Sequence, residues 1–284
     1  MQHRPQLRQF LRLVPHKYRG PASIAIALIA GAFYLFQSCT GTQIPDGGSA
    51  HLRMGNPSQA GSAPDNYLLE KPQYALSYNR SLGTANWVSW QLNASWLGEA
   101  ERQDDFRPDE SLPAGWERIR HGDYMGSGYD RGHLTPSADR TRSASDNSAT
   151  FLMTNIVPQT PENNRGAWKD LEAYARDLVR QGKELYVVAG VYGKGKRIGD
   201  GKVTAPSHTW KAMLVLDRPN AGLDSVSDNA RVIAIDIPNR NNLKSDWQDY
   251  IVTVDDIEAS TGYDLFSNLP DGVETAIERR RDRG

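Results

Sequence analysis

Three stretches in the second half of the chain consist almost entirely of β-branched and other apolar residues, and they constrain the fold most. They read ELYVVAG at 184–190, TWKAMLVLD at 209–217 and RVIAIDIP at 231–238. Their length and composition are typical of strands. Three earlier stretches extend the set: YALSYN at 74–79, WVSWQLN at 87–93 and the apolar FLMTNIVPQ at 151–159. The sequence therefore predicts a sheet at the centre of the fold.

Helical periodicity is clear in one segment, residues 165–183, where apolar residues recur at the three- to four-residue spacing of an amphipathic helix. Residues 253–263 predict a short helix, and residues 272–284 predict a basic helix that frays. Residues 97–128 have no regular pattern. Because strands and helices follow one another in mixed order, we expect an α+β fold with a central, mainly antiparallel sheet and flanking helices.

The charge distribution limits the functions that the chain can have. Residues 1–39 hold five Lys or Arg and no acid, whereas residues 40–284 hold 28 bases against 34 acids. A module that only binds nucleic acid usually has a basic surface, so this acidic balance argues against one but allows an enzyme with a local basic cleft. Cys39 is the single cysteine. An intramolecular disulfide, a cysteine-rich zinc site and a cysteine nucleophile in the catalytic part are therefore excluded.

The N-terminal segment, residues 1–39, has the pattern of an export signal. A basic stretch precedes the uncharged apolar run IAIALIAGAFYLF at 24–36. This run is short for a membrane span, although residues 21–39 come near the minimum of about 17. The adjoining LFQSC resembles a relaxed lipoprotein box in which Cys39 would be lipidated. Three interpretations of this segment remain open: a lipoprotein signal, an uncleaved membrane anchor and an ordinary cleaved signal. All three place the protein outside the cytoplasm (secreted, periplasmic or membrane-anchored), and only this segment would contact a membrane.

Residues 40–66 follow as a segment of different character. Eleven of these 27 residues are Gly, Pro or Ser, and no hydrophobic period is present. We therefore expect a flexible linker in which His51 is idle. No internal repeat and no second stretch of this kind follows. Residues 67–284 are accordingly expected to form one domain.

The segment YDRGHLTPSADR at 129–140 concentrates residues suited to attack on an anionic group. His133 offers a base that works near neutral pH, an arginine such as Arg131 grips phosphate, and Gly132 allows close approach of the backbone. For this short motif alone, a polar turn with a hydrogen-bonded histidine is the alternative.

Residues 130–176 predict strand, loop, strand and helix, with His133 on the first strand and Asn164 at the entrance of the helix. Steps of four keep Asn164, Glu172 and Arg176 in one helical row, so they could face one site. Eight helical residues rise about 12 Å, which is too far for Asn164 and Glu172 both to bind one metal ion directly. Glu172 could instead act through a metal-bound water. The alternative is an N-cap asparagine with a solvent-facing Glu–Arg pair.

Three blocks in this order resemble the DNA/RNA non-specific endonuclease family of the ββα-metal (His-Me finger) superfamily. They are WQLNASWLGEAERQDDFRPD at 90–109, DRGHLTPSADR at 130–140 and FLMTNIVPQTPENNRGAWKDLE at 151–172. The resemblance runs from about Trp87 to Gly262 and leaves the leader and the linker uncovered. It implies a ββα-metal finger packed on the central sheet. It also implies an endonuclease that hydrolyses DNA and RNA with little sequence or sugar specificity.

Carried over residue by residue, the resemblance implies that His133 is the general base that removes a proton from the attacking water. Asn164 is then the sole direct protein ligand of one Mg²⁺ or Mn²⁺, and Glu172 holds one of the waters around that ion. Arg102 contacts the phosphate and stabilises the transition state. The other assigned residues are Arg131 and Arg176, which line the cleft; Asp130, which orients the finger or tunes the histidine; and Asn155, a supporting residue on the second strand.

The implied chemistry suits these residue types, because a hard cation and an arginine both offset the negative charge that builds up in phosphodiester hydrolysis. The expected products carry 5′-phosphates. Single- and double-stranded DNA and RNA are the expected substrates, since phosphate contacts carry no sequence information. A dedicated protein inhibitor, which some relatives have, stays open as a partner. The alternative function is a catalytically degenerate member that binds nucleic acid or protein. A zinc hydrolase is a third possibility, but the sequence contains neither an HExxH motif nor a Cys/His cluster that could bind zinc.

Overall fold

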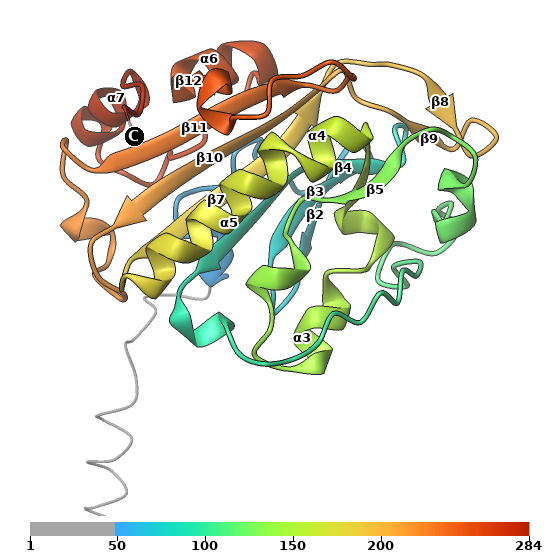
Figure 1. Cartoon of the computed structure of the whole chain (residues 1–284), viewed down its shortest axis with the longest axis horizontal. Helices are drawn as coiled ribbons and strands as arrows, with labels where there is room; N and C mark the ends of the chain where they lie inside the picture. Colours follow the sequence, from blue (N-terminus) through green and yellow to red (C-terminus); the bar gives the residue numbers. More distant parts are fainter. Residues whose placement is uncertain (1–48, 284) are drawn as a thin grey trace, which may run out of the picture. The chain divides into compact units, whose positions relative to one another are not determined.

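The computed structural model describes residues 49–283, and the main feature of this part of the chain is one eight-stranded sheet (Figure 1). The strand order is β1-β2-β3-β4-β7-β10-β11-β12, and all neighbouring strands are antiparallel. The strands are β1 (Ser62–Ala63), β2 (Asn66–Glu70), β3 (Ala75–Asn79), β4 (Thr84–Leu92), β7 (Glu184–Tyr192), β10 (His208–Leu216), β11 (Arg231–Pro238) and β12 (Ile251–Val252). The expected α+β class with a mainly antiparallel sheet is confirmed.

The central strands are buried on both faces of the sheet, which explains their nearly continuous apolar sequences. The helices are α3 (Ala144–Ala149), α4 (Pro161–Arg165), α5 (Ala167–Arg180), α6 (Val254–Thr261) and α7 (Asp271–Glu278). On β7, Leu185 and Val187 pack in the apolar cluster under α5, whereas Tyr186 and Val188 pack in a cluster on the opposite face. Apolar residues of α6 and α7 cover that opposite face (Figure 1).

The predicted order of strand, loop, strand and helix is present beside the large sheet. β5 (Asp130–His133) pairs antiparallel with β6 (Ile156–Gln159), and α4 and α5 follow in the chain. A side chain on Gly132 would overlap the buried side chain of Gln159 on the neighbouring strand. Glycine is therefore required where the two strands approach each other. A further small hairpin consists of β8 (Arg197–Ile198) and β9 (Val203–Thr204).

The predicted continuous helix over residues 165–183 is wrong at its start. Gly166, with φ −99° and ψ −123°, separates α4 from α5. A Cβ at this position would lie 2.6 Å from the carbonyl oxygen of Glu162, so glycine suits the break. Asn164 belongs to α4, whose N-cap is Thr160, while Gly166 is the N-cap of α5. Asn164 thus caps neither helix, and it does not share one helical axis with Glu172.

The predicted strand over residues 151–159 is wrong in its first half. Met153–Asn155 forms a 3-10 helix, and only residues 156–159 extend as β6. All but one of the residues from 151 to 159 are buried. A buried run of this kind has no period that distinguishes a turn of helix from a strand, which explains the error.

The predicted flexible linker is also wrong for residues 49–66, because these residues belong to the same compact unit as residues 67–283. His51 lies in the 3-10 helix Ala50–Leu52, is 4% exposed and accepts a hydrogen bond from the backbone N–H of Gln91 on β4. Met54 is buried in the cluster on the far face of the sheet. A few buried side chains and hydrogen bonds hold this segment in place, and it has no periodic apolar face. Its composition therefore gave no sign that the segment is folded.

No helix within residues 49–283 is both long enough and apolar enough to cross a membrane. The predicted export segment, including Cys39, and the first part of the predicted linker lie outside the described residues.

Candidate active site

His133 ends strand β5 and is buried, with 9% of the residue exposed. Its ring packs edge-on against Phe151, with ring centroids 4.9 Å apart, and lies 5.5 Å from the Phe106 ring. The buried Nε2 atom has no hydrogen-bond partner among the described residues, so the hydrogen-bonded polar turn is wrong. Burial, together with the nearby Arg102 and Arg131 guanidinium groups, lowers the pKa of His133 to about 3. The imidazole is therefore neutral at pH 7.

Two arginines flank this histidine through the same aromatic residues. The Arg102 guanidinium lies 4.8 Å from the centroid of the Phe151 ring, and the Arg131 guanidinium lies 4.3 Å from the centroid of Phe106. Each phenylalanine thus contacts His133 and an arginine. This arrangement surrounds a neutral base with positive charge, which suits the binding of an anionic group.

Both arginines keep part of their hydrogen-bonding capacity for a ligand. The Arg102 side chain is 50% exposed, pairs with Asp104 at 2.7 Å and donates from Nη1 to the Ser137 hydroxyl at 2.8 Å. Arg131 forms a hydrogen bond with the exposed His121. A guanidinium has five N–H donors, so neither contact exhausts it.

Asn164 is oriented by Asp130, which lies on β5. The Asn164 Nδ2 donates to the Asp130 carboxylate at 3.0 Å, and Arg165 donates to the same carboxylate at 2.8 and 2.6 Å. Burial alone would raise the pKa of Asp130, but the hydrogen bonds from Arg165 and Asn164 outweigh it and hold the pKa below its usual value. With Nδ2 engaged in this way, the amide oxygen of Asn164 is left to bind a cation.

Glu172 lies on α5 beside a buried lysine of the central sheet. Lys211 on β10 is 1% exposed at its side chain, and its Nζ lies 3.3 Å from the Glu172 carboxylate, which is 12% exposed. The ammonium also lies 4.0 Å from the centroid of the Trp168 ring. Burial raises the pKa of Glu172 and lowers that of Lys211, while their mutual attraction opposes both shifts. Glu172 is therefore held in one place by an ion pair that solvent scarcely reaches.

Arg176, one turn further along α5, pairs with Asp139 at 2.9 Å, and the two side chains are 14% and 3% exposed. Asp139 also accepts a hydrogen bond from the Trp90 indole N–H at 3.0 Å. Glu172 and Arg176 thus have separate buried partners, so the alternative of a solvent-facing Glu–Arg pair is wrong.

Asn155 lies in the 3-10 helix before β6 and not, as was predicted, on the second strand. Its side chain accepts a hydrogen bond from Thr135 N–H at 2.9 Å and donates to the Thr135 and Thr150 carbonyl oxygens. Asn155 is fully buried. It therefore fixes the loop that follows His133.

The structure also connects the two halves of the predicted site. The Trp168 indole N–H on α5 donates to the His133 carbonyl oxygen at 3.3 Å, and the Arg176–Asp139 pair joins α5 to the loop that follows β5. The predicted residues therefore belong to one structural unit.

Sequence reasoning missed Lys211, Asp139 and the two phenylalanines. Lys211 had a visible signal, because a lysine inside the apolar stretch TWKAMLVLD needs a partner once the strand is buried. Phe106 and Phe151 had none, since their contact with His133 depends on chain segments that meet only in the fold.

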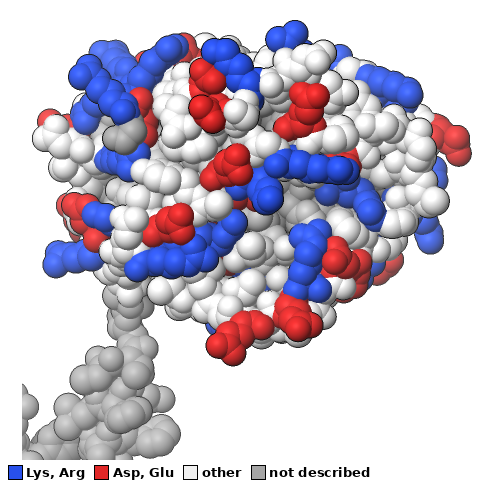
Figure 2. Space-filling model, in the orientation of Figure 1, with Lys and Arg blue, Asp and Glu red and all other residues white. Residues whose placement is uncertain are grey.

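The surface around this region is locally basic although the chain is not. Figure 2 shows several Lys and Arg side chains around a hollow in the face that carries α5 and β5, with acidic side chains interspersed among them. Arg165, at 70% exposed, is one of the accessible basic side chains of this unit.

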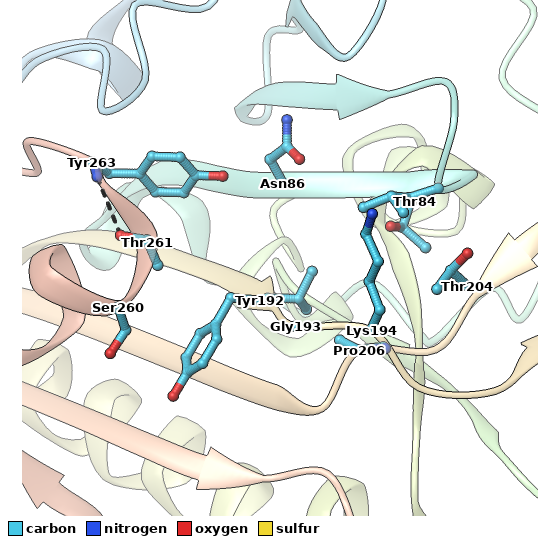
Figure 3. A pocket seen from close by; sticks show the side chains of 12 residues that line it. Thr84, Asn86, Tyr192, Gly193, Lys194, Thr204, Pro206, Ser260, Thr261 and Tyr263 are labelled. Carbon is cyan, nitrogen blue, oxygen red and sulfur yellow. Dashed lines mark hydrogen bonds between the residues drawn. The ribbon is translucent and has the colours of Figure 1, made fainter.

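A separate hollow of about 180 Å³ opens on the other side of the sheet (Figure 3). Its lining includes Tyr192, Lys194, Ser260 and Tyr263. It contains none of the predicted site residues. The His133 region is the stronger candidate because its titratable and cationic groups converge, whereas this hollow lacks such an arrangement.

The chain is similar to known proteins over most of its length. The family model described as DNA/RNA non-specific endonuclease matches residues 48–272. The chain is 57% identical over 244 residues to a nuclease of Nostoc sp. (strain PCC 7120 / SAG 25.82 / UTEX 2576), covering 85% of this chain and 89% of that protein. It is 35% identical over 211 residues to the mitochondrial nuclease EXOG of Danio rerio, covering 69% of this chain and 60% of that protein.

A solved structure is similar in fold as well. A chain in the crystal structure of the EndoG/EndoGI complex, which concerns the mechanism of EndoG inhibition, matches with a TM-score of 0.67 and 25% sequence identity. The match covers 81% of this chain and 95% of that one.

Proposed function

The chain belongs to the DNA/RNA non-specific endonuclease family and is a hydrolase that acts on nucleic acids, and we propose that it cleaves phosphodiester bonds with His133 as the general base and a divalent metal ion as cofactor. The observation that carries this proposal is the buried, neutral His133, whose Nε2 has no partner among the described residues and which lies between two arginines.

His133 would accept the proton of the attacking water. A pKa of about 3 describes the protein alone, where two guanidinium groups oppose protonation. A bound phosphodiester neutralises part of that positive charge and moves the pKa towards the range in which a base is effective. Substrate binding would therefore strengthen the base at the moment that it is needed.

Asn164 and Glu172 fit a hard divalent cation. Asn164 offers an amide oxygen, which the Asp130 contact to Nδ2 orients, and Glu172 offers a carboxylate that could hold a metal-bound water. A bound Mg²⁺ or Mn²⁺ would stabilise negative charge on the phosphate and on the leaving 3′ oxygen, which supports the proposal of 5′-phosphate products.

Arg102 and Arg131 would bind the phosphate, and Arg176 would support the cleft wall from its pair with Asp139. None of the proposed contacts involves the edge of a base. The proposal therefore includes low sequence and sugar specificity, with single- and double-stranded DNA and RNA as substrates.

Export is a further part of the proposal and rests on the N-terminal sequence pattern. A protein inhibitor is a candidate partner, because the similar solved structure is a complex of EndoG with EndoGI that concerns EndoG inhibition.

The test is degradation of plasmid DNA and of RNA by the purified protein with Mg²⁺, Mn²⁺ or EDTA. We expect cleavage with either metal and none with EDTA. His133→Ala should lower turnover by a factor of at least about 10² while DNA affinity and folding stay near wild type. His208→Ala, a histidine stacked on Tyr192 on the opposite face, is the matched control and should cleave normally. Wild-type protein that binds DNA without cleaving it would support the degenerate alternative instead.

A further inference from the structure

Helices α6 and α7, whose apolar residues cover the face of the sheet opposite to α5, bring three acidic side chains together. Asp255 and Glu258 lie on α6, three residues apart and therefore on one helix face. Glu278 lies at the end of α7. Carboxylate oxygens of the three residues all lie within 4.8 Å of one another. The cluster thus joins two helices that are distant from the proposed catalytic residues.

Glu278 carries the strongest signal in this cluster. The residue is only 6% exposed, and its buried Oε1 has no hydrogen-bond partner among the described residues. The ion pair nearest to the cluster joins Asp255 to Arg279 at 3.9 Å, between side chains that are 48% and 72% exposed. No ion pair within residues 49–283 reaches Glu278 or Glu258. A buried carboxylate without such compensation is costly.

Either a bound proton or a bound cation can offset the free-energy cost of burying the Glu278 carboxylate. Burial, together with the carboxylates of Glu258, Glu274 and Asp255, raises the pKa of Glu278 to about 9. Burial likewise raises the pKa of Glu258, although the hydrogen bond that its carboxylate accepts from Leu265 N–H at 2.8 Å acts against it, and Asp264 and Asp255 raise it further. In the absence of a cation, Glu278 therefore holds a proton at pH 7. A cation that binds there has to displace this proton.

We propose that Asp255, Glu258 and Glu278 bind a Ca²⁺ ion that fastens α7 to α6. Carboxylate oxygens are the hard ligands that this ion prefers, and oxygens at 2.3–2.6 Å from Ca²⁺ span up to about 5 Å across the ion. Oxygens of the three carboxylates lie within 4.8 Å of one another, so one ion can contact all of them. Mg²⁺ demands near-octahedral geometry and usually keeps several of its waters, so a site of three protein carboxylates suits it less well.

The site would act on stability and not on the reaction. Ile277, next to Glu278, is buried in the apolar cluster on this face, so fastening α7 keeps that part of the core covered. The inference does not depend on the proposed function, because none of the three acids belongs to the candidate active site.

The experiment compares thermal unfolding midpoints at pH 8 in EDTA and in CaCl2. Ca²⁺ could also bind at the catalytic residues, so Asn164→Ala is measured alongside wild type. We expect Ca²⁺ to raise the midpoint in both proteins and in Glu70→Gln, which alters an exposed glutamate on β2. Glu278→Gln should lose the Ca²⁺-dependent rise, and Mg²⁺ at equal concentration should give a smaller rise.

Calorimetric titration with Ca²⁺ alone, in two buffers of different ionisation enthalpy, should show that about one proton is released for each ion bound. Asp255→Asn alters an exposed ligand and should weaken Ca²⁺ binding at least ten-fold, which provides a second variant if Glu278→Gln does not fold. A wild-type midpoint that does not respond to Ca²⁺ would overturn the proposal and leave Glu278 as a protonated acid. So would a Ca²⁺ response that Glu278→Gln retains or Asn164→Ala loses.

Discussion

His133 and Lys211 are both buried bases, but their neighbours differ in charge. His133 contacts two aromatic rings and lies near two guanidinium groups, so the neutral form is favoured. Lys211 lies 3.3 Å from the Glu172 carboxylate, which matches its charge. His133 is therefore neutral in the protein alone, whereas Lys211 fixes a carboxylate in place.

The proposed roles of Asn164 and Arg102 predict different responses to metal. Asn164→Ala should raise the Mn²⁺ concentration needed for activity, because the only direct protein ligand is lost. Arg102→Ala should lower turnover with little change in metal dependence. Glu172→Ala should fall between them, since a contact through water positions the ion without a direct bond. The measurement is activity against Mn²⁺ concentration.

Arg102→Lys is the control for this series, and it should restore activity only poorly because a point charge cannot reproduce the planar guanidinium. If Asn164→Ala titrates like wild type while Arg102→Ala needs more metal, the two roles are reversed or wrong.

Lys211→Met tests the buried ion pair. Removing one partner leaves the Glu172 carboxylate buried without its cation, so we expect a loss of about 3–5 kcal/mol of unfolding free energy. Glu172→Gln in addition should recover part of that loss, while activity stays low because Glu172 is missing. Urea unfolding of the wild type, both single variants and the double variant gives the coupling energy. Strictly additive effects of the two substitutions would show that the pair is not coupled.

At the scale of elements, the 3-10 helix Ala50–Leu52 is bonded to the central sheet through His51. His51 has a defined tautomer, because Gln91 N–H donates to Nδ1 at 3.2 Å and leaves Nε2 to donate to the Pro72 carbonyl oxygen at 2.9 Å. Burial, together with the charge of Arg140, lowers the pKa of His51 to about 4, although the bond to Pro72 acts against it. Protonation of Nδ1 would expel the Gln91 N–H.

Acid should therefore weaken the fold through His51. The folded-state pKa lies below the usual value of about 6.5, so between these values the unfolded chain binds more protons and stability falls as pH falls. The largest slope for one such group is about 1.4 kcal/mol per pH unit. His133 acts in the same direction. In urea unfolding between pH 4.5 and 7.5, the unfolding free energy of His51→Gln should change with pH along a shallower slope than that of the wild type. Equal slopes for His51→Gln and wild type would exclude this role.

At the scale of the whole molecule, the surface charge and the predicted cellular location depend on different parts of the chain. Residues 40–284 carry six more acids than bases, yet basic side chains gather around the hollow beside α5 (Figure 2). A local basic region can attract an anionic substrate while the acidic remainder favours release of the product. Location, in contrast, is predicted from the first 39 residues alone.

The leader predicts that the protein is found outside the cytoplasmic membrane. If Cys39 is lipidated, Cys39→Ser should move the protein from the membrane fraction to the soluble fraction after cell fractionation. Cys39→Ser protein that stays in the membrane would favour an uncleaved helix as the anchor. Cytoplasmic wild-type protein would contradict export in every form.

The longer strands of the central sheet and the order of the finger could be predicted from the sequence, because both depend on local properties, whereas β2 and the two-residue strands were missed. Residues 231–238 were predicted as a strand and form β11, and His133 was predicted on a strand and ends β5. The break at Gly166 was missed, since Asn164 and Trp168 keep helical spacing across it. The ion pair between Lys211 and Glu172 was missed because it joins side chains 39 residues apart.

The sequence alone determined the fold class through its apolar patterns, and its resemblance to a known family gave the family and the identity of the residues proposed for chemistry. Only the tertiary structure decided what state those residues are in. The burial of His133, the orientation of Asn164 by Asp130 and the charge beside Glu172 all come from segments that are distant in the chain. The physical reason is that desolvation and Coulomb interactions depend on distance in space.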